Sequence, residues 1–266
     1  MRALEDGDVL YLPHLGFSIE PDEIPLLSSD SAAKSKNISL GAAGGVHGSS
    51  LDGAPAGRLE ALMRRFVRQS RDLLSSLLPK YQSAIIPGRT SFRPVGIESR
   101  STSWRKDDTR LHVDSFPSSP VQGRRILRFF SNINPDGRPR TWRLGGRFEG
   151  VVTRFLPALS APMRGSSRLL ELIKVTRGRR SAYDHFMLQL HDRMKADAHY
   201  QAETAQIRRD FPAGSTWIVF TDCVPHAAIA GQHALEQTYY LPVDAMADSS
   251  KSPLRVLERR LGRRLV

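Results

Sequence analysis

The stretch STWIVFTDCVPHAAIAG, residues 215–231, decides the fold class of this chain. Its first half, STWIVFTD, follows the turn-like FPAG and is rich in β-branched and aromatic residues, so it predicts a strand. HAAIA then predicts a second short strand, with no helix between the two. Short strands that follow one another in this way are typical of an antiparallel sandwich or jelly roll.

Similar strand-like segments occur from about residue 89 onward. Alternating β-branched, aromatic and apolar residues, bounded by Gly, Pro and Asp, predict further strands at SFRP (91–94), ESRSTSWR (98–105), TRLHVD (109–114), RILRFFSNIN (125–134) and LEQTYYLPV (235–243). We expect a single domain over residues 1–266. Its fold class is predicted as mainly β with helices (α+β), on a double-stranded β-helix (jelly-roll) core.

Helices are expected around this core. Apolar residues at helical spacing over 59–77, ended by Pro79, predict an N-terminal helix. A helical insertion is predicted at about 157–200. Within it, Ser181 begins a helix, and Asp184, three residues on, resembles the second member of a capping box.

The insertion carries another helix and two histidines. The segment LLELIKV predicts a helix that Ser166 or Ser167 caps and Gly178 ends. His185 and His191 flank the apolar stripe of the helix that begins at Ser181. Both are therefore predicted to be solvated rather than to bind a metal.

Two further segments differ from the core in composition. Residues 28–57 are rich in Gly, Ala and Ser and nearly devoid of large side chains, which predicts a flexible loop, with a lid that orders on ligand binding as the alternative. A basic helix is expected at about 252–266, with leucines on one face and arginines on the rest. Such a helix either lies on an anionic membrane surface or docks on its own domain, and the sequence leaves both open.

The composition and charge of the chain exclude several classes of protein. The 266 residues are 40% hydrophobic, and no apolar run is long enough to span a bilayer. The start, MRALEDGDVLYLP, does not resemble a signal peptide. A single cysteine, Cys223, excludes an intramolecular disulfide framework and fits a reducing cytosol. The net charge of +12 suits a nucleic acid, an anionic membrane or an acidic small substrate.

A candidate metal site combines two distant segments. His112 and Asp114 lie two residues apart, so a strand directs both to one face, while Leu111 and Val113 point into a core. His226 begins another β segment much later in the chain. A His-x-Asp pair with a distant His is the facial triad of non-haem Fe(II) oxygenases, which leaves positions open for a co-substrate and O₂.

An iron of this kind commonly takes 2-oxoglutarate, whose far carboxylate needs a cationic anchor. The stretch from His226 to residue 243 holds no Arg or Lys, although most such enzymes place the anchor there. Arg128, which shares a strand face with Asn132, is the best substitute, and a surface salt bridge is its alternative role. Asn132, Gln237 and Thr238 are expected to add hydrogen bonds to the co-substrate.

Five segments resemble a known family. They are SWRKDDTRLHVDSFPSSP, GRRILRFFSNINPDGRPRTWR, YDHFMLQLHD, FPAGSTWIVFTDCVPHA and GQHALEQTYYLP. They are similar to the bacterial Kdo hydroxylases, which depend on Fe(II) and 2-oxoglutarate and act on the 3-deoxy-octulosonic acid of the lipopolysaccharide inner core. The likeness covers nearly the whole chain outside the small-residue loop. It implies iron binding by His112, Asp114 and His226.

The resemblance also implies a reaction and a place. Kdo on lipid A would gain a hydroxyl at carbon 3 to give Ko, while 2-oxoglutarate gives succinate and CO₂ and ascorbate supports activity. The expected protein is cytoplasmic, contacts the inner face of the inner membrane peripherally, and has no nucleic acid as partner. Arg110, on the face of His112, is the first candidate to bind the sugar carboxylate or the co-substrate. The weaker candidates are Arg93, Arg105, Lys106, Arg140 and Arg143.

Two other functions stay open from the residues alone. The same iron centre would serve an oxygenase that acts on a protein or nucleic acid, which the positive charge would also attract. A non-catalytic jelly-roll module that binds anionic lipid or RNA is the other alternative. That module predicts no Fe(II) affinity and no loss of function when His112 is replaced by alanine.

Overall fold

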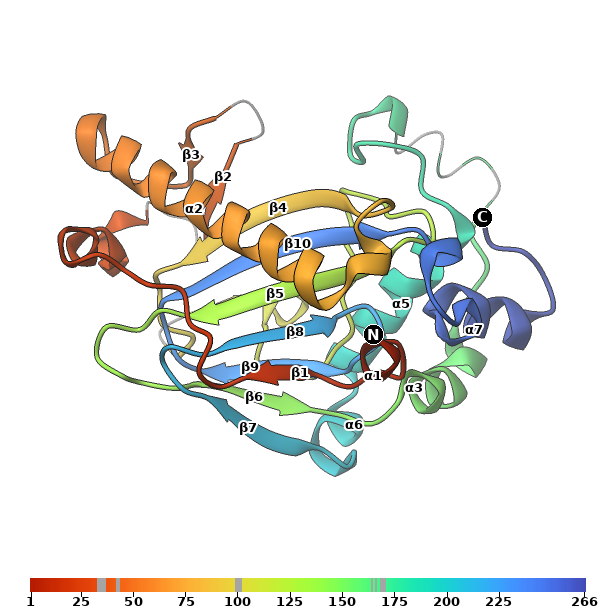
Figure 1. The fold of residues 1–266 in the computed structure, drawn as a ribbon. Coiled ribbons are helices and arrows are strands. Elements are labelled where there is room, and N and C mark those ends of the chain that lie inside the picture. Colours follow the sequence, from red (N-terminus) through yellow and green to blue (C-terminus); the bar gives the residue numbers. More distant parts are fainter. Residues whose placement is uncertain (33–36, 42–43, 99–101, 164, 166, 168–170) are drawn as a thin grey trace.

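The computed structural model describes residues 1–266 apart from 33–36, 42–43, 99–101, 164, 166 and 168–170. Its framework is a seven-stranded sheet in the order β1-β8-β5-β10-β4-β2-β3 and a three-stranded sheet in the order β7-β6-β9 (Figure 1). Neighbouring strands run antiparallel throughout. The strands are Leu10–Leu12 (β1), Ile38–Leu40 (β2), Val46–His47 (β3), Ile86–Arg93 (β4), Arg125–Asn132 (β5), Arg140–Leu144 (β6), Ile207–Phe211 (β7), Thr216–Phe220 (β8), His226–Ala230 (β9) and Ala234–Leu241 (β10). The predicted α+β class with a jelly-roll core is confirmed.

The two sheets meet through aromatic side chains. Strands β5 and β8 are buried along their whole length, which explains their nearly continuous apolar sequences. Phe130 of β5 stacks on Trp217 of β8, with ring centroids 5.2 Å apart. Trp142 of β6 meets both rings edge-on, at 4.9 and 5.6 Å. This aromatic layer holds the small sheet against the large one.

Helix α2 (Gly53–Leu77) lies across strands β4 and β10 of the large sheet (Figure 1). Its buried residues Leu59, Leu62 and Phe66 pack in one cluster with Phe92 and Leu235 of those strands. The predicted helix is confirmed, but it begins six residues earlier than the apolar pattern, because small residues at its start carry no periodic signal.

The prediction of a flexible loop over 28–57 is wrong for most of the residues that the structure describes there. Strands β2 and β3 form a hairpin, and β2 pairs with β4, so it extends the large sheet. Ile38 is fully buried in this arrangement. Backbone hydrogen bonds to a sheet edge need no large side chains, which is why the composition concealed the hairpin. Residues 33–36 and 42–43 of the predicted loop lie outside the described part.

The other helices are α1 (Arg2–Glu5), α3 (Phe148–Phe155), α5 (Ala182–Ala196), α6 (Ala198–Glu203) and α7 (Pro253–Leu261). Short 3₁₀ helices cover Pro21–Leu27, Ser29–Ser31, Pro79–Tyr81, Trp104–Lys106, Leu156–Ala158, Val243–Ala245 and Ser249–Lys251. The capping box of α5 is confirmed, because the Asp184 N–H donates to Ser181 Oγ at 3.1 Å and the Ser181 N–H donates to Asp184 Oδ2 at 2.9 Å. The helical region begins at α3, earlier than the predicted 157.

Three local predictions need correction. Residues 102–105 of the predicted strand ESRSTSWR contain the start of a 3₁₀ turn, and 99–101 lie outside the described residues. TRLHVD contributes an isolated bridge at His112 instead of a strand. The chain is helical at residues 171–172 but continues as turns and bends from residue 173, so the predicted helix does not reach Gly178; 166 and 168–170 are not described.

The C-terminal helix is docked on its own domain. Leu254 and Leu257 of α7 are buried in the main core, as is Leu265 beyond it. Gly262 ends the helix with φ +65°, the left-handed conformation that a C-terminal glycine supplies. Within the described residues, no helix is both long and apolar enough to cross a membrane.

Candidate metal centre

Backbone pairing brings the three predicted ligands together. His112 and His226 face each other in an antiparallel bridge: the His112 N–H donates to the His226 carbonyl at 3.0 Å, and the His226 N–H to the His112 carbonyl at 2.8 Å. The Asp114 N–H donates to the Thr221 carbonyl at 2.8 Å, just before the turn that leads to His226. Facing residues of an antiparallel pair project to the same side, and so does the residue two further on. Leu111, which precedes His112 and points to the opposite side, is fully buried in the core as expected.

The donor atoms fit a metal ion. Nδ1 of His112 lies 2.7 Å from the Arg110 carbonyl, and Nδ1 of His226 lies 2.9 Å from the Val224 carbonyl. Nδ1–H therefore donates to these carbonyls, which leaves each Nε2 lone pair for a metal. One ligand atom from each of His112, Asp114 and His226 lies within 4.8 Å of the others. Two imidazoles and one carboxylate suit Fe(II).

The electrostatics favour the protonation states that bind a metal. Burial lowers the pKa of His112 well below its usual value, and the neighbouring His226 lowers it further. Burial also lowers the pKa of His226. Burial alone would raise the pKa of Asp114, but the Arg128 guanidinium and the two imidazoles hold it well below its usual range. The site thus presents neutral imidazoles and an ionised carboxylate, the forms that coordinate metals.

Aromatic rings support the two histidines. Trp142 of β6 stacks on the His226 ring, with centroids 5.1 Å apart and planes 23° from parallel. The His191 ring meets the His112 ring edge-on at 5.2 Å. The prediction that His191 is solvated is wrong: its side chain is 12% exposed, and Nδ1 lies 2.9 Å from Asp192 Oδ1. His185 is half-buried, with Nε2 3.1 Å from the Ser160 carbonyl.

Arg128 lies beside Asp114, one of the three predicted ligands. Its Nε is 3.3 Å from Asp114 Oδ2, and its Nη1 is 3.1 Å from Glu236 Oε1. The residue is only 9% exposed, yet its Nε has no hydrogen-bond partner of good geometry. Arg93 approaches the same glutamate from the other side, with Nη2 2.5 Å from Glu236 Oε2 and Nη1 3.6 Å from Asp108 Oδ2. One buried carboxylate therefore lies between two guanidinium groups.

A cavity of about 510 Å³ opens over this pair of arginines. Strands β4, β5 and β10 and the loop that follows Asp114 form its walls. Its basic lining residues are Arg89, Arg93, Arg124, Arg128 and Arg177. The Arg177 N–H is fixed to the Ser118 carbonyl at 2.9 Å, which holds a distant part of the chain against the loop. Because its lining holds five arginines and one glutamate, the cavity carries the positive charge that an anionic ligand needs.

The structure separates Thr238 from Gln237. Thr238 lines the basic cavity with Glu236 and Arg128. Gln237 instead points to the opposite face of β10, where its Oε1 accepts from Thr90 Oγ1 at 2.5 Å and its Nε2 donates to the Thr238 carbonyl. Consecutive residues of a strand face opposite sides, so the two cannot both reach one co-substrate.

Asn132 is held by the backbone around it. Its Nδ2 donates to the carbonyls of Arg138 and Phe211 at 3.0 and 2.9 Å, and its Oδ1 accepts from the Asn134 N–H at 3.0 Å. It is fully buried at the C-terminal end of β5. This amide organises the turn after β5 and is not among the residues that line the cavity.

Of the basic residues predicted to bind substrate, the cavity includes Arg93 only. Arg110 pairs with Asp107 and donates to the Lys195 carbonyl at 2.8 Å. Arg105 pairs with Asp192 and lies over the Trp104 ring. The remaining candidates are placed as follows: Lys106 is exposed on a 3₁₀ turn, Arg140 is buried with Nη1 3.5 Å from the Gly231 carbonyl, and Arg143 donates to the Thr109 carbonyl.

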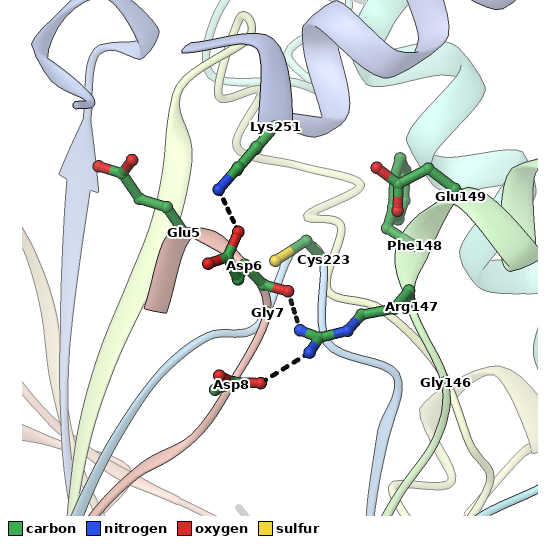
Figure 2. A pocket seen from close by; sticks show the side chains of 10 residues that line it. All are labelled: Glu5, Asp6, Gly7, Asp8, Gly146, Arg147, Phe148, Glu149, Cys223 and Lys251. Atoms are coloured by element: carbon green, nitrogen blue, oxygen red, sulfur yellow. Dashed lines mark hydrogen bonds and ion pairs between the residues drawn. The ribbon is translucent and has the colours of Figure 1, made fainter. Parts of the chain in front are cut away.

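Cys223 lines a cavity that contains none of the three predicted ligands. Figure 2 shows its thiol at the wall of a separate cavity, among Asp6, Arg147 and Lys251, which are engaged in ion pairs and hydrogen bonds. Burial raises the pKa of Cys223 to about 12, so the thiol stays protonated and unreactive.

Sequence reasoning missed Arg89, Arg124, Arg177 and Glu236. Glu236 carried a signal, because it alternates with Thr238 along β10 and shares its face. Arg177 carried none, because only tertiary contact brings it to the loop after Asp114.

Comparisons with known proteins agree with this site. Residues 1–264 match the family described as 3-deoxy-D-manno-oct-2-ulosonic acid (Kdo) hydroxylase. The crystal structure of the Kdo hydroxylase KdoO, a non-heme Fe(II) alpha-ketoglutarate-dependent dioxygenase, with alpha-ketoglutarate and Fe(III) is 48% identical and has a TM-score of 0.96. That match covers 100% of this chain and 90% of KdoO.

Two further KdoO structures are similar to the same degree. The complex with cobalt(II) has a TM-score of 0.97 at 48% identity, covering 100% of this chain and 90% of KdoO. The complex with succinate and Fe(III) has a TM-score of 0.95 at 48% identity, covering 100% and 89%. A comparison with curated protein sequences gave no match. Together with the His112–Asp114–His226 centre, the match over the whole chain shows that this protein belongs to the Kdo hydroxylase family.

Proposed function

We propose that this protein is an Fe(II)- and 2-oxoglutarate-dependent dioxygenase that hydroxylates Kdo on lipid A at carbon 3, which gives Ko. The observation that carries the proposal is the His112–Asp114–His226 centre beside a cavity lined by arginines. When bound, Fe(II) with 2-oxoglutarate and O₂ supplies the oxidising chemistry, and 2-oxoglutarate becomes succinate and CO₂. The protein's own residues bind, orient and shield the reactants.

The cavity supplies the charges that such a substrate needs. Kdo carries a carboxylate and lipid A carries phosphates. Because Arg93 is already paired with Glu236 and Asp108, the guanidinium groups of Arg89, Arg124 and Arg177 are better placed to bind these anions. We therefore assign substrate binding to these cavity-wall residues instead of to Arg110 and Arg105. We place the protein at the inner face of the inner membrane, where it meets the glycolipid.

The proposed function is tested by succinate release from the purified protein with Fe(II), 2-oxoglutarate and O₂, with Kdo-bearing lipid A or with lipid A that lacks Kdo. We expect strong stimulation by the Kdo-bearing lipid alone, and one added oxygen in its sugar by mass spectrometry. Oxygen incorporated into a protein or nucleic acid instead would contradict the substrate assignment. Lack of iron binding would point to the non-catalytic module.

We further propose that Arg128 anchors the far carboxylate of 2-oxoglutarate, next to Thr238. The support is its buried guanidinium, 3.3 Å from the iron ligand Asp114, with Nε lacking a well-aligned partner. Replacing Arg128 by methionine should raise the KM for 2-oxoglutarate roughly 10- to 100-fold, the loss of one charge-assisted contact. Arg105→Met, at an exposed pair with Asp192, is the matched control and should change nothing.

The readout is the KM for 2-oxoglutarate at saturating Kdo-lipid, together with iron content and melting temperature. An Arg128→Met protein that keeps its iron and its KM for 2-oxoglutarate would disprove the anchor. Arg93→Met would then be the next variant, because Arg93 is the other buried guanidinium at Glu236.

A further inference from the structure

An exposed strip of apolar and basic side chains borders the arginine-lined cavity. Leu172, Ile173 and Val175 are 79%, 56% and 52% exposed, although all three are large aliphatic residues. Lys174 lies among them, and the exposed Arg177 and Arg179 follow. We call these six described residues the 172–179 strip. Aliphatic side chains clustered in water are unfavourable, so such a strip marks an interaction surface.

Hydrogen bonds join the strip to the wall of the arginine-lined cavity. Thr176, in its middle, is buried, and the Arg177 N–H donates to the Ser118 carbonyl at 2.9 Å. Arg180, the next basic residue, donates to the Pro117 carbonyl at 2.7 Å. Pro117 and Ser118 line the cavity, as does Arg177 itself. Whatever the strip binds therefore lies next to the arginine-lined cavity.

A second surface continues the strip towards the C-terminus. Met163, 81% exposed, lines a groove of about 930 Å³ together with Arg179, Arg180 and Val266. The described parts of this region lie beside the C-terminus, away from the N-terminal helix α2 (Figure 1). Apolar and basic groups thus alternate over one end of the molecule.

We propose that the 172–179 strip is the site at which the protein docks on an anionic phospholipid bilayer. Exposed aliphatic residues interleaved with Lys and Arg match the interfacial region of such a bilayer, where apolar groups enter the acyl boundary and cations meet phosphates. The sequence left open that the C-terminal helix α7 binds the membrane. That helix does not offer an apolar face for this contact, because Leu254 and Leu257 are buried in the core. The inference deepens the proposed function, since a sugar carried on a membrane lipid must reach a cavity held close to the membrane.

The test is co-sedimentation of the full-length protein with phosphatidylcholine vesicles, with or without phosphatidylglycerol. Wild type should bind the anionic vesicles and lose most binding at high salt. Leu172→Glu/Ile173→Glu should bind at least about tenfold more weakly, because two aliphatic groups no longer enter the bilayer. Lys174→Gln/Arg179→Gln should lose about fivefold per charge. Ile207→Glu, at an equally exposed position on β7, is the matched control and should bind like wild type.

Three outcomes would overturn the inference: no wild-type binding to anionic vesicles, equal binding to neutral ones, or unchanged binding by Leu172→Glu/Ile173→Glu. Melting temperatures show that the variants are folded. Because this assay contains neither iron nor Kdo, it is independent of the proposed reaction.

A second arm links docking to turnover. Succinate release with a deacylated, water-soluble Kdo saccharide should be unchanged in Leu172→Glu/Ile173→Glu, while release with vesicle-embedded Kdo-lipid A should fall at least about tenfold. An equal fall with both substrates would refute docking as the role of the strip. If wild type turns over neither substrate, the proposed function fails and vesicle binding alone decides the inference.

Discussion

Replacement of His226 by alanine is expected to abolish Fe(II)-dependent succinate release and to weaken iron binding more than about 100-fold. Loss of a residue that only hydrogen-bonds to a metal ligand already lowers metal affinity about 10- to 100-fold, and loss of a ligand should cost more. The residue would donate one of the three atoms that the site offers to a metal. Iron content after dialysis, titration of Fe(II) under anaerobic conditions and succinate release together measure the effect.

Two further variants make this result decisive. His226→Gln keeps most of the volume stacked on Trp142, so it separates loss of a ligand from loss of packing. His199→Ala removes an exposed imidazole that pairs with Glu203, and it should retain iron and activity. If His226→Gln is folded and still holds iron as wild type does, the ligand assignment is wrong.

Breaking the buried pair of Arg125 and Asp222 should destabilise the protein by about 3–5 kcal/mol. Arg125 Nε lies 2.7 Å from Asp222 Oδ2, both side chains are essentially inaccessible, and the guanidinium also lies over the Phe220 ring. Arg125→Met leaves an uncompensated carboxylate in the core. Urea unfolding, measured by circular dichroism, gives the free energy of unfolding.

The same pair should affect the iron centre. Asp222 belongs to the turn between Thr221, whose carbonyl receives the Asp114 N–H, and His226. Arg125→Met should therefore also lower iron affinity, while Arg125→Met/Asp222→Leu should recover most of the stability because no charge remains buried alone. A single variant as stable as wild type would show that the pair contributes nothing.

The three candidate ligands that the structure brings together could be predicted from the sequence because each depends on local geometry. His112 and Asp114 are two residues apart on extended chain, and His226 begins a recognisable β segment. The facial-triad pattern combined these two segments, which spacing alone does not place together, and the family resemblance then implied the same three residues. The helix over 59–77 and the capping box at Ser181 were likewise local patterns.

The residues around the candidate metal centre could not be predicted in the same way. Gln237 was chosen beside Thr238 because the sequence does not tell which face of β10 meets the cavity, and only pairing with β4 and β5 decides it. Strand β6, which carries Trp142, is short and rich in arginine, so its burial between β7 and β9 gave no apolar signal. Arg177 reaches the cavity through one backbone contact with Ser118.

The bridge between His112 and His226 has a consequence for how the metal is acquired. Both hydrogen bonds of that bridge join main-chain atoms, and the Nδ1 contacts that orient the rings are also to main-chain carbonyls. The backbone therefore orients both imidazole rings. Loading should need little reorganisation, and exchange of one divalent ion for another should be governed by access and by donor chemistry rather than by refolding of the polypeptide.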